Sequence, residues 1–245
     1  MKYGENTERK KIKLAIISGA LSALLVSTTF FTPLFKINHV KVNLNSFTTE
    51  REILEAAHIK YGETILPFLS EKKVISQLKS HPYILDAKLK KSWPQKIILE
   101  IKYRNDSFAI PNAGFYIVLD DQLQVLRVDK MAYDATILEG LTFKEFKIGK
   151  KITVDQYKIL EQIVKLKQLM NKSHIAFLAK IDYSNDCLIV YTKQGLKASF
   201  GDGKNAEIRF NNFAEIYDNL NSKKIKSGLI DVSSDGLPIY KPFGN

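Results

Sequence analysis

Residues 81–102 of the 245-residue chain read HPYILDAKLKKSWPQKIILEIK, and this stretch decides the fold of the region around it. Residues 83–91 form a predicted strand. A second strand is indicated by apolar residues that alternate with polar ones from Ile97 to Tyr103. Between the two lies Ser92-Trp93-Pro94-Gln95, where proline sets a turn geometry. We expect the Trp93 ring to pack on the end of this sheet and to stabilise it.

The residues before this stretch complete a small domain. Residues 40–44 alternate as a further strand. Thr49 and Glu52 have the spacing of a capping box and predict the start of a helix. Ser70 is placed to cap a second helix, and Pro82 ends it. The order β-α-α-β-β predicts two helices on one face of a small sheet.

An apolar run near the N-terminus indicates a membrane anchor. Residues 14–31 read LAIISGALSALLVSTTFF and carry no charge. About 20 helical residues, each rising about 1.5 Å, span the hydrocarbon core of a bilayer. The short tail before the run is basic, which predicts a cytoplasmic N-terminus and a C-terminal part outside the membrane. We therefore expect a cytoplasmic tail at residues 1–11 and a single transmembrane helix at residues 12–35.

Two other interpretations of the run fit less well. A cleaved signal peptide usually has an apolar core of about 7–15 residues and an A-x-A-like site, and no such site follows at the right distance. A buried core helix fits poorly, because this run is apolar on every face.

The formal net charge of the chain is +11, supplied mostly by lysine. A lysine-rich codon bias accounts for it, and so does attraction to an anionic surface such as wall polymers, lipid head groups or an acidic partner. Nucleic acid is not an expected partner, because the basic residues would lie outside the cytoplasm. Cys187 is the only cysteine, so the chain cannot form an intramolecular disulfide.

The second half of the chain predicts a mixed β domain with two helices. Residues 105–112 interrupt the pattern, which predicts a domain boundary there. Thr153 and Gln156 have capping-box spacing before one helix, and the other helix carries aromatic residues from Phe210 to Tyr217. The predicted strands of this region are residues 115–119, 124–127, 181–183, 188–192 and 196–200.

No catalytic constellation is visible. The chain has no G-x-S-x-G and no H-E-x-x-H motif, so we expect no metal and no cofactor. Asp120 and Asp121 are adjacent on a strand and would point to opposite faces, which predicts solvated turn residues and not a carboxylate pair. Gly201-Asp202-Gly203 predicts a hairpin turn. Exposed strand edges are the functional feature that is left. Their unpaired N–H and C=O groups can accept a partner's extended segment.

The arrangement resembles the FtsQ/DivIB family of bacterial division proteins. The resemblance is carried by residues 81–102 and by a series of short segments in the second half. These segments are Val118-Leu119-Asp120, Val125-Leu126, Leu138-Glu139-Gly140, residues 196–201 leading into the helix with Arg209, and Ile230-Asp231-Val232. The resemblance implies an α+β fold, with a POTRA domain at residues 37–105 and an FtsQ/DivIB-type β domain at residues 106–245. The chain departs from the family at Lys102-Tyr103-Arg104, which lacks the usual glutamate, and at Gln122 and Arg209.

The resemblance also implies a function: a non-enzymatic scaffold of the division complex at the septum, in the cell membrane. Its implied partners are small bitopic coiled-coil proteins, FtsB/DivIC-like and FtsL-like. The resemblance implies that these partners bind at Ser234, Asp235, Gly236, Leu237, Ile239 and Tyr240. Pro238 lacks an N–H and would interrupt this strand. The alternatives are a membrane-tethered envelope enzyme acting on wall polymer and a POTRA-type transport module.

Overall fold

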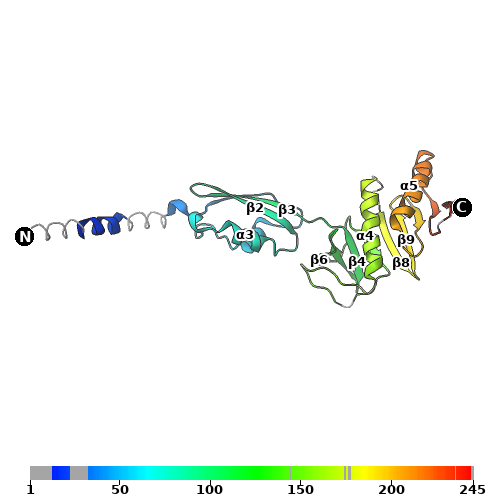
Figure 1. Ribbon diagram of the computed structural model, residues 1–245, viewed down its shortest axis with the longest axis horizontal. Helices are drawn as coiled ribbons and strands as arrows, with labels where there is room; N and C mark the ends of the chain where they lie inside the picture. The colour runs from blue at the N-terminus through cyan, green and yellow to red at the C-terminus, as the bar shows by residue number, and fades with distance from the viewer. Residues whose placement is uncertain are drawn as a thin grey trace, which may run out of the picture. The chain divides into compact units, whose positions relative to one another are not determined.

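The computed structural model describes residues 13–22, 33–143, 145–173, 175, 178–234 and 236–243 (Figure 1). The chain divides into two compact units, the first ending at Tyr103 and the second beginning at Arg104. Each unit has its own apolar core.

Residues 13–22 are helical, and every side chain of this helix is exposed. No described helix is both long and apolar enough to cross a membrane. Residues 1–12 and 23–32 lie outside the described residues, and with them the predicted cytoplasmic tail and part of the predicted transmembrane helix.

The first unit has the predicted β-α-α-β-β order (Figure 1). Its three-stranded sheet has the order β1-β3-β2, with β1 parallel and β2 antiparallel to the central strand β3. The elements are η1 (Pro33–Phe35), β1 (His39–Val42), α2 (Glu50–Ala56), η2 (Leu66–Phe68), α3 (Glu71–Leu78), β2 (Ile84–Ser92) and β3 (Lys96–Tyr103).

Both helices of this unit begin at the predicted caps. The Thr49 hydroxyl accepts from the Glu52 amide, and the Glu52 carboxylate accepts from the Thr49 amide at 2.8 Å, which completes the capping box. The Ser70 hydroxyl accepts from the Lys73 amide. The buried faces of α2 and α3 share one core with the sheet, so the helices cover one face of it.

Trp93 is placed differently from the prediction. Its side chain is 56% exposed, and its ring meets Phe35 edge-on at 5.9 Å between centroids. The ring therefore packs against the segment that enters the unit, and more than half of it faces solvent.

The second unit is built on one nine-stranded sheet of order β12-β11-β10-β9-β8-β7-β4-β5-β6. Buried side chains of α4 and α5 join the same core as the inward side chains of the strands, so both helices lie on one face. The elements are β4 (Phe108–Asn112), β5 (Phe115–Leu119), β6 (Val125–Asp129), β7 (Thr136–Glu139), α4 (Tyr157–Lys172), β8 (Leu178–Ser184), β9 (Cys187–Thr192), β10 (Leu196–Ser199), α5 (Ala206–Ser222), β11 (Gly228–Asp231) and β12 (Ile239–Lys241).

Strand β4 corrects the expected interruption at residues 105–112. It runs antiparallel to β5 and parallel to β7. The pairing with β7 involves only Phe108 and Ala109, so Pro111 lies where β5 alone flanks the strand. A proline is tolerated there because one side of the strand needs no donor.

The predicted capping box of Thr153 and Gln156 is wrong. Helix α4 begins at Tyr157, and its N-cap Gln156 makes no side-chain capping bond. The Gln156 side chain instead accepts from the Thr142 amide at 3.0 Å. A contact with a distant loop has replaced the local cap.

Asp120 also differs from the prediction of a solvated turn residue. It is buried, and its carboxylate forms an ion pair with the Arg104 guanidinium at 2.6 Å. Its neighbour Asp121 is exposed, as expected.

Candidate partner-binding edge

The sheet of the second unit ends at β6 on one side and at β12 on the other. The outer side of β6 is partly covered. The Val125 amide donates to the Lys150 carbonyl at 2.9 Å, and the Gly149 amide donates to the Val125 carbonyl at 2.8 Å. These bonds occupy backbone groups that another chain would need.

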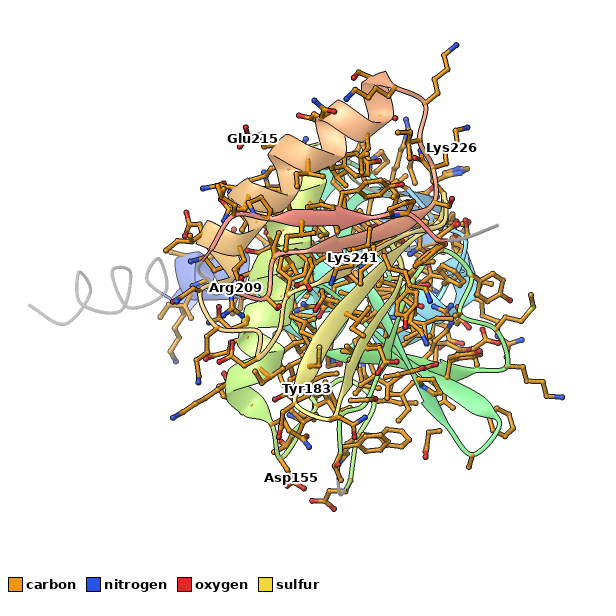
Figure 2. All side chains as sticks on the ribbon, turned by 90° about the vertical axis from the view of Figure 1, so that its right-hand side faces the viewer. Asp155, Tyr183, Arg209, Glu215, Lys226 and Lys241 are labelled. Carbon is orange, nitrogen blue, oxygen red and sulfur yellow. The ribbon has the colours of Figure 1, made fainter. Side chains whose placement is uncertain are left out.

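Strand β12 pairs on one side only. It runs antiparallel to β11, with Ile239 opposite Asp231 and Tyr240 opposite Ile230. In the part of the chain that the structure describes, no strand pairs with its other side. Figure 2 shows this end of the sheet, with Lys241 of β12 labelled. Such an edge can accept an extended segment through backbone hydrogen bonds.

Tyr240 holds β12 against the sheet. Its ring packs on the core of the unit, and its hydroxyl donates to the Ser227 carbonyl at 2.7 Å. Gly228, at φ 137°, leaves the space for this ring, because a Cβ there would lie 2.4 Å from Tyr240 Cε2. The Tyr240 side chain therefore serves the strand's own docking.

Exposed apolar side chains lie on β12 and next to it along the chain. Leu237 is 89% exposed and Ile239 is 53% exposed. Phe243, beyond the end of β12, is 44% exposed. Solvent-facing apolar groups beside an unpaired strand are the kind of surface that a partner would cover.

The six predicted partner-binding residues fall into distinct places. Ser234 and Gly236 are exposed in the connection before β12, and Leu237 follows them. Ile239 and Tyr240 lie on β12 itself. Asp235 lies outside the described residues.

Two features of this edge were not predicted. Pro238 precedes β12, so the strand contains no proline and its pairing is not interrupted. Phe243 was not among the predicted residues, since a single aromatic residue near the chain end has no periodic pattern that would mark it.

Charged groups lie beside the edge. Lys241 Nζ lies 3.7 Å from Asp231 Oδ2. The pKa of Asp231 is lowered, because the Ser233 hydroxyl donates a hydrogen bond to the carboxylate and Lys241 adds a positive charge nearby. Lys197 Nζ lies 5.2 Å from the ring centroids of both Tyr191 and Phe243. These cation–π contacts connect Phe243 to β9 and β10.

No group of three or more His, Cys, Asp or Glu residues within the described ranges could hold a metal ion. His39, His58 and His81 lie in separate places in the first unit, and His174 is outside the described residues. The open edge of β12 is thus the feature of the second unit that best suits recognition.

Comparison with known proteins gives a match to one domain model and a set of named relatives. The model of the FtsQ-type POTRA domain matches residues 35–104. Cell division protein DivIB of Clostridium botulinum (strain Hall) is 26% identical over 246 residues, covering 95% of this chain and 92% of that protein. DivIB of Clostridium acetobutylicum is 26% identical, and the match covers 89% of this chain and 87% of that protein. DivIB of Listeria monocytogenes is 25% identical, and the match covers 82% of this chain and 70% of that protein.

A solved structure also matches. It is the major extracytoplasmic domain of DivIB from Geobacillus stearothermophilus, at 17% identity and a TM-score of 0.30. The match covers 49% of this chain and 97% of that chain, and its TM-score is too low to inform the fold.

The chain thus combines a region that matches the FtsQ-type POTRA model with a β-rich second unit. The FtsQ-type POTRA match covers residues 35–104, and over most of its length the chain is similar to cell division proteins named DivIB. The relatives are named as cell division proteins, which supports a role in cell division. Their names state a process, cell division, and no reaction.

Proposed function

We propose that this protein is a membrane-anchored scaffold that assembles and stabilises the division complex at the septum. Its partners are small bitopic coiled-coil division proteins, FtsB/DivIC-like and FtsL-like. The observation that carries the proposal is the open edge of β12 in a chain whose relatives are DivIB proteins. Each partner contributes an extended segment next to its coiled coil.

The mechanism is strand addition at β12. Backbone hydrogen bonds along the edge give affinity, and side chains beside it give selectivity. Leu237, Ile239 and Phe243 supply the apolar contacts. The covered start of β6 makes that opposite edge a poorer acceptor.

The membrane arrangement is part of the proposal. Residues 1–11 lie in the cytoplasm, residues 12–35 span the membrane, and the POTRA domain (37–105) and β domain (106–245) lie outside. Support comes from the described helix at residues 13–22, where Leu14, Ile16, Ile17 and Leu21 are all exposed. Leu14, Ile17 and Leu21 share one side of the helix and Ile16 lies beside them, so this exposed apolar side suits a lipid environment. Anchoring all partners in one membrane raises their effective concentration and lets weak contacts suffice.

The test measures capture of the FtsB/DivIC-like partner by the full-length chain in membranes. Replacing Leu237 and Ile239 together by glutamate places charges in the proposed contact. We expect a loss of about 1–3 kcal/mol, or roughly 5- to 150-fold in affinity, as for other central interface residues. The matched control is Ile208→Glu, because Ile208 is an exposed apolar residue on α5.

A second variant tests the whole segment. Deleting residues 234–245 removes β12 and should abolish capture while leaving the POTRA domain folded. Capture that survives both the deletion and the double substitution would locate the contact on the POTRA sheet or the membrane helix, and would reject the β12 site.

A further inference from the structure

The first residues of the POTRA unit belong to its fold and leave no linker. Ile37 is fully buried in the core, and its amide donates to the Thr64 carbonyl at 2.9 Å. Lys36 forms a backbone bridge with Ile65. A membrane span that ends at Phe35 is therefore followed almost at once by residues fixed in the domain.

The β2–β3 turn is bound to this entering segment. Gln95 Nε2 donates to the Pro33 carbonyl at 3.1 Å, and the Asn38 amide donates to the Gln95 carbonyl at 3.1 Å. The Trp93 ring contacts Phe35, the last residue of the proposed span. The turn must consequently lie within a few ångströms of the place where the chain leaves the bilayer.

This end of the unit exposes apolar groups. Leu34 is 54% exposed, and Trp93 is exposed to a similar extent. Trp has an apolar ring with one N–H donor, a combination enriched at the boundary between membrane and water.

The same end is basic. Segments 33–38 and 90–96 carry Lys36, Lys90, Lys91 and Lys96 and no carboxylate. Lys90 pairs with Glu100, and Lys91 donates to the Pro67 carbonyl. For Lys36 and Lys96 the described residues offer no ion-pair partner. Lysines next to a membrane are attracted to anionic lipid head groups.

We propose that the β2–β3 turn docks into the head-group layer of an anionic membrane. Trp93 and Leu34 insert their apolar surfaces at the interface, and Lys36 and Lys96 contact lipid phosphates. This second contact fixes the POTRA domain at the bilayer surface. The inference rests on the proposed anchor at residues 12–35 and is independent of the proposed partner site on β12.

Because Trp93 is the only tryptophan, its fluorescence reports on this turn alone. The experiment reconstitutes the full-length chain into vesicles of phosphatidylcholine, with or without phosphatidylglycerol. Some vesicles carry lipids brominated near the head group, which quench a tryptophan at that depth, and acrylamide quenches from the water. In phosphatidylglycerol vesicles we expect a shift of Trp93 emission to shorter wavelength, strong quenching by brominated lipid and protection from acrylamide.

Charge variants test the role of the lysines. Replacing Lys36 and Lys96 by glutamine should reduce the lipid quenching and restore acrylamide access. The matched control replaces Lys72 and Lys102 by glutamine, because both lysines are exposed and lie away from this turn. It should keep the wild-type lipid quenching and the wild-type protection from acrylamide. Circular dichroism of each variant confirms that the chain is folded.

The outcomes separate this inference from the anchor. A chain that resists carbonate extraction, yet whose Trp93 stays open to acrylamide and unquenched by lipid, overturns the docking and leaves the anchor standing. A chain that carbonate releases overturns both. Protection of Trp93 only after a division partner is added would make the turn a protein contact and would likewise reject lipid docking.

Discussion

Asp120 and Asp121 are neighbours in sequence with opposite environments. The Asp120 carboxylate accepts from the amides of Gln122 and Gln124 at 2.9 and 2.7 Å, and pairs with Arg104. Asp121 faces solvent. The alternation of a strand predicts that the two point apart. It does not reveal which one is buried, because Arg104 is brought to Asp120 by the fold.

Asp120→Ala should lower the free energy of unfolding by about 3–5 kcal/mol, because it leaves the Arg104 guanidinium without its buried partner. Urea unfolding of the full-length chain in detergent, followed by circular dichroism, measures this change. The adjacent control, Asp121→Ala, should stay within about 0.5 kcal/mol of wild type. Equal effects of the two substitutions would contradict the assignment.

Lys167 on α4 gives a prediction about pH. Its ammonium donates to the Ser107 carbonyl and to Thr136 Oγ1 at 3.0 Å, and lies 4.3 Å from the Phe108 ring centroid. Burial lowers its pKa from 10.5 to about 8, an effect that nearby Asp121 opposes. From about pH 8 to 10.5 the unfolded chain binds more protons than the folded chain at this site. The site's contribution to stability therefore rises with pH in that window.

The rise should not exceed about 3.5 kcal/mol, since the pKa falls from 10.5 to about 8 and one pKa unit corresponds to about 1.4 kcal/mol. Urea unfolding at several pH values across the window measures it as the difference between wild type and Lys167→Met, because other lysines and tyrosines titrate in both chains. Lys165→Met, at an exposed position of the same helix, should keep the wild-type slope. If the free energy of unfolding of Lys167→Met changed with pH as it does in wild type, Lys167 would not be the group that causes the rise.

Among the elements, β12 depends on an empty space beside Gly228. Gly228→Ala places a Cβ where the Tyr240 ring lies, so we expect β12 to detach from β11. Hydrogen exchange should become faster at residues 239–241, and partner capture should weaken. Gly236→Ala is the control for hydrogen exchange alone, because a Cβ there meets only Ser234 Oγ at 3.6 Å. Slow exchange at β12 in Gly228→Ala would show that the strand is held by other contacts.

Elements with local signals were predicted well. The helices of the POTRA unit follow from Thr49, Glu52 and Ser70, whose caps need only residues three positions away. Strand β4 was missed because its pairing with β5 and β7 outweighs the local effect of Pro111. The predicted edge residues share the last segment, but sequence alone could not show that Tyr240 turns inward, which requires Gly228 to lie beneath it.

Across the whole chain, the order of the nine strands could not be predicted. The parallel pairs β4–β7, β7–β8 and β10–β11 join strands separated by long segments or helices. Alternation in a strand indicates which residues share a face but not which strand lies alongside. That order is what leaves β12 at the outer edge, so the site depends on information carried by the complete fold.

The proposed topology has the two units outside the membrane and the N-terminal tail inside. Cysteine labelling tests this in a Cys187→Ser background, which has no other cysteine. Lys172→Cys lies at an exposed position of α4 and should react with a membrane-impermeant maleimide on intact spheroplasts. Lys10→Cys, in the basic tail, should react only after the spheroplasts are lysed, because positive flanks stay in the cytoplasm. Two results would contradict this topology: labelling of Lys10→Cys before lysis, or labelling of Lys172→Cys only after lysis. Either would reverse the orientation of the chain. The β12 edge would then lie in the cytoplasm, where extracytoplasmic partner segments cannot reach it.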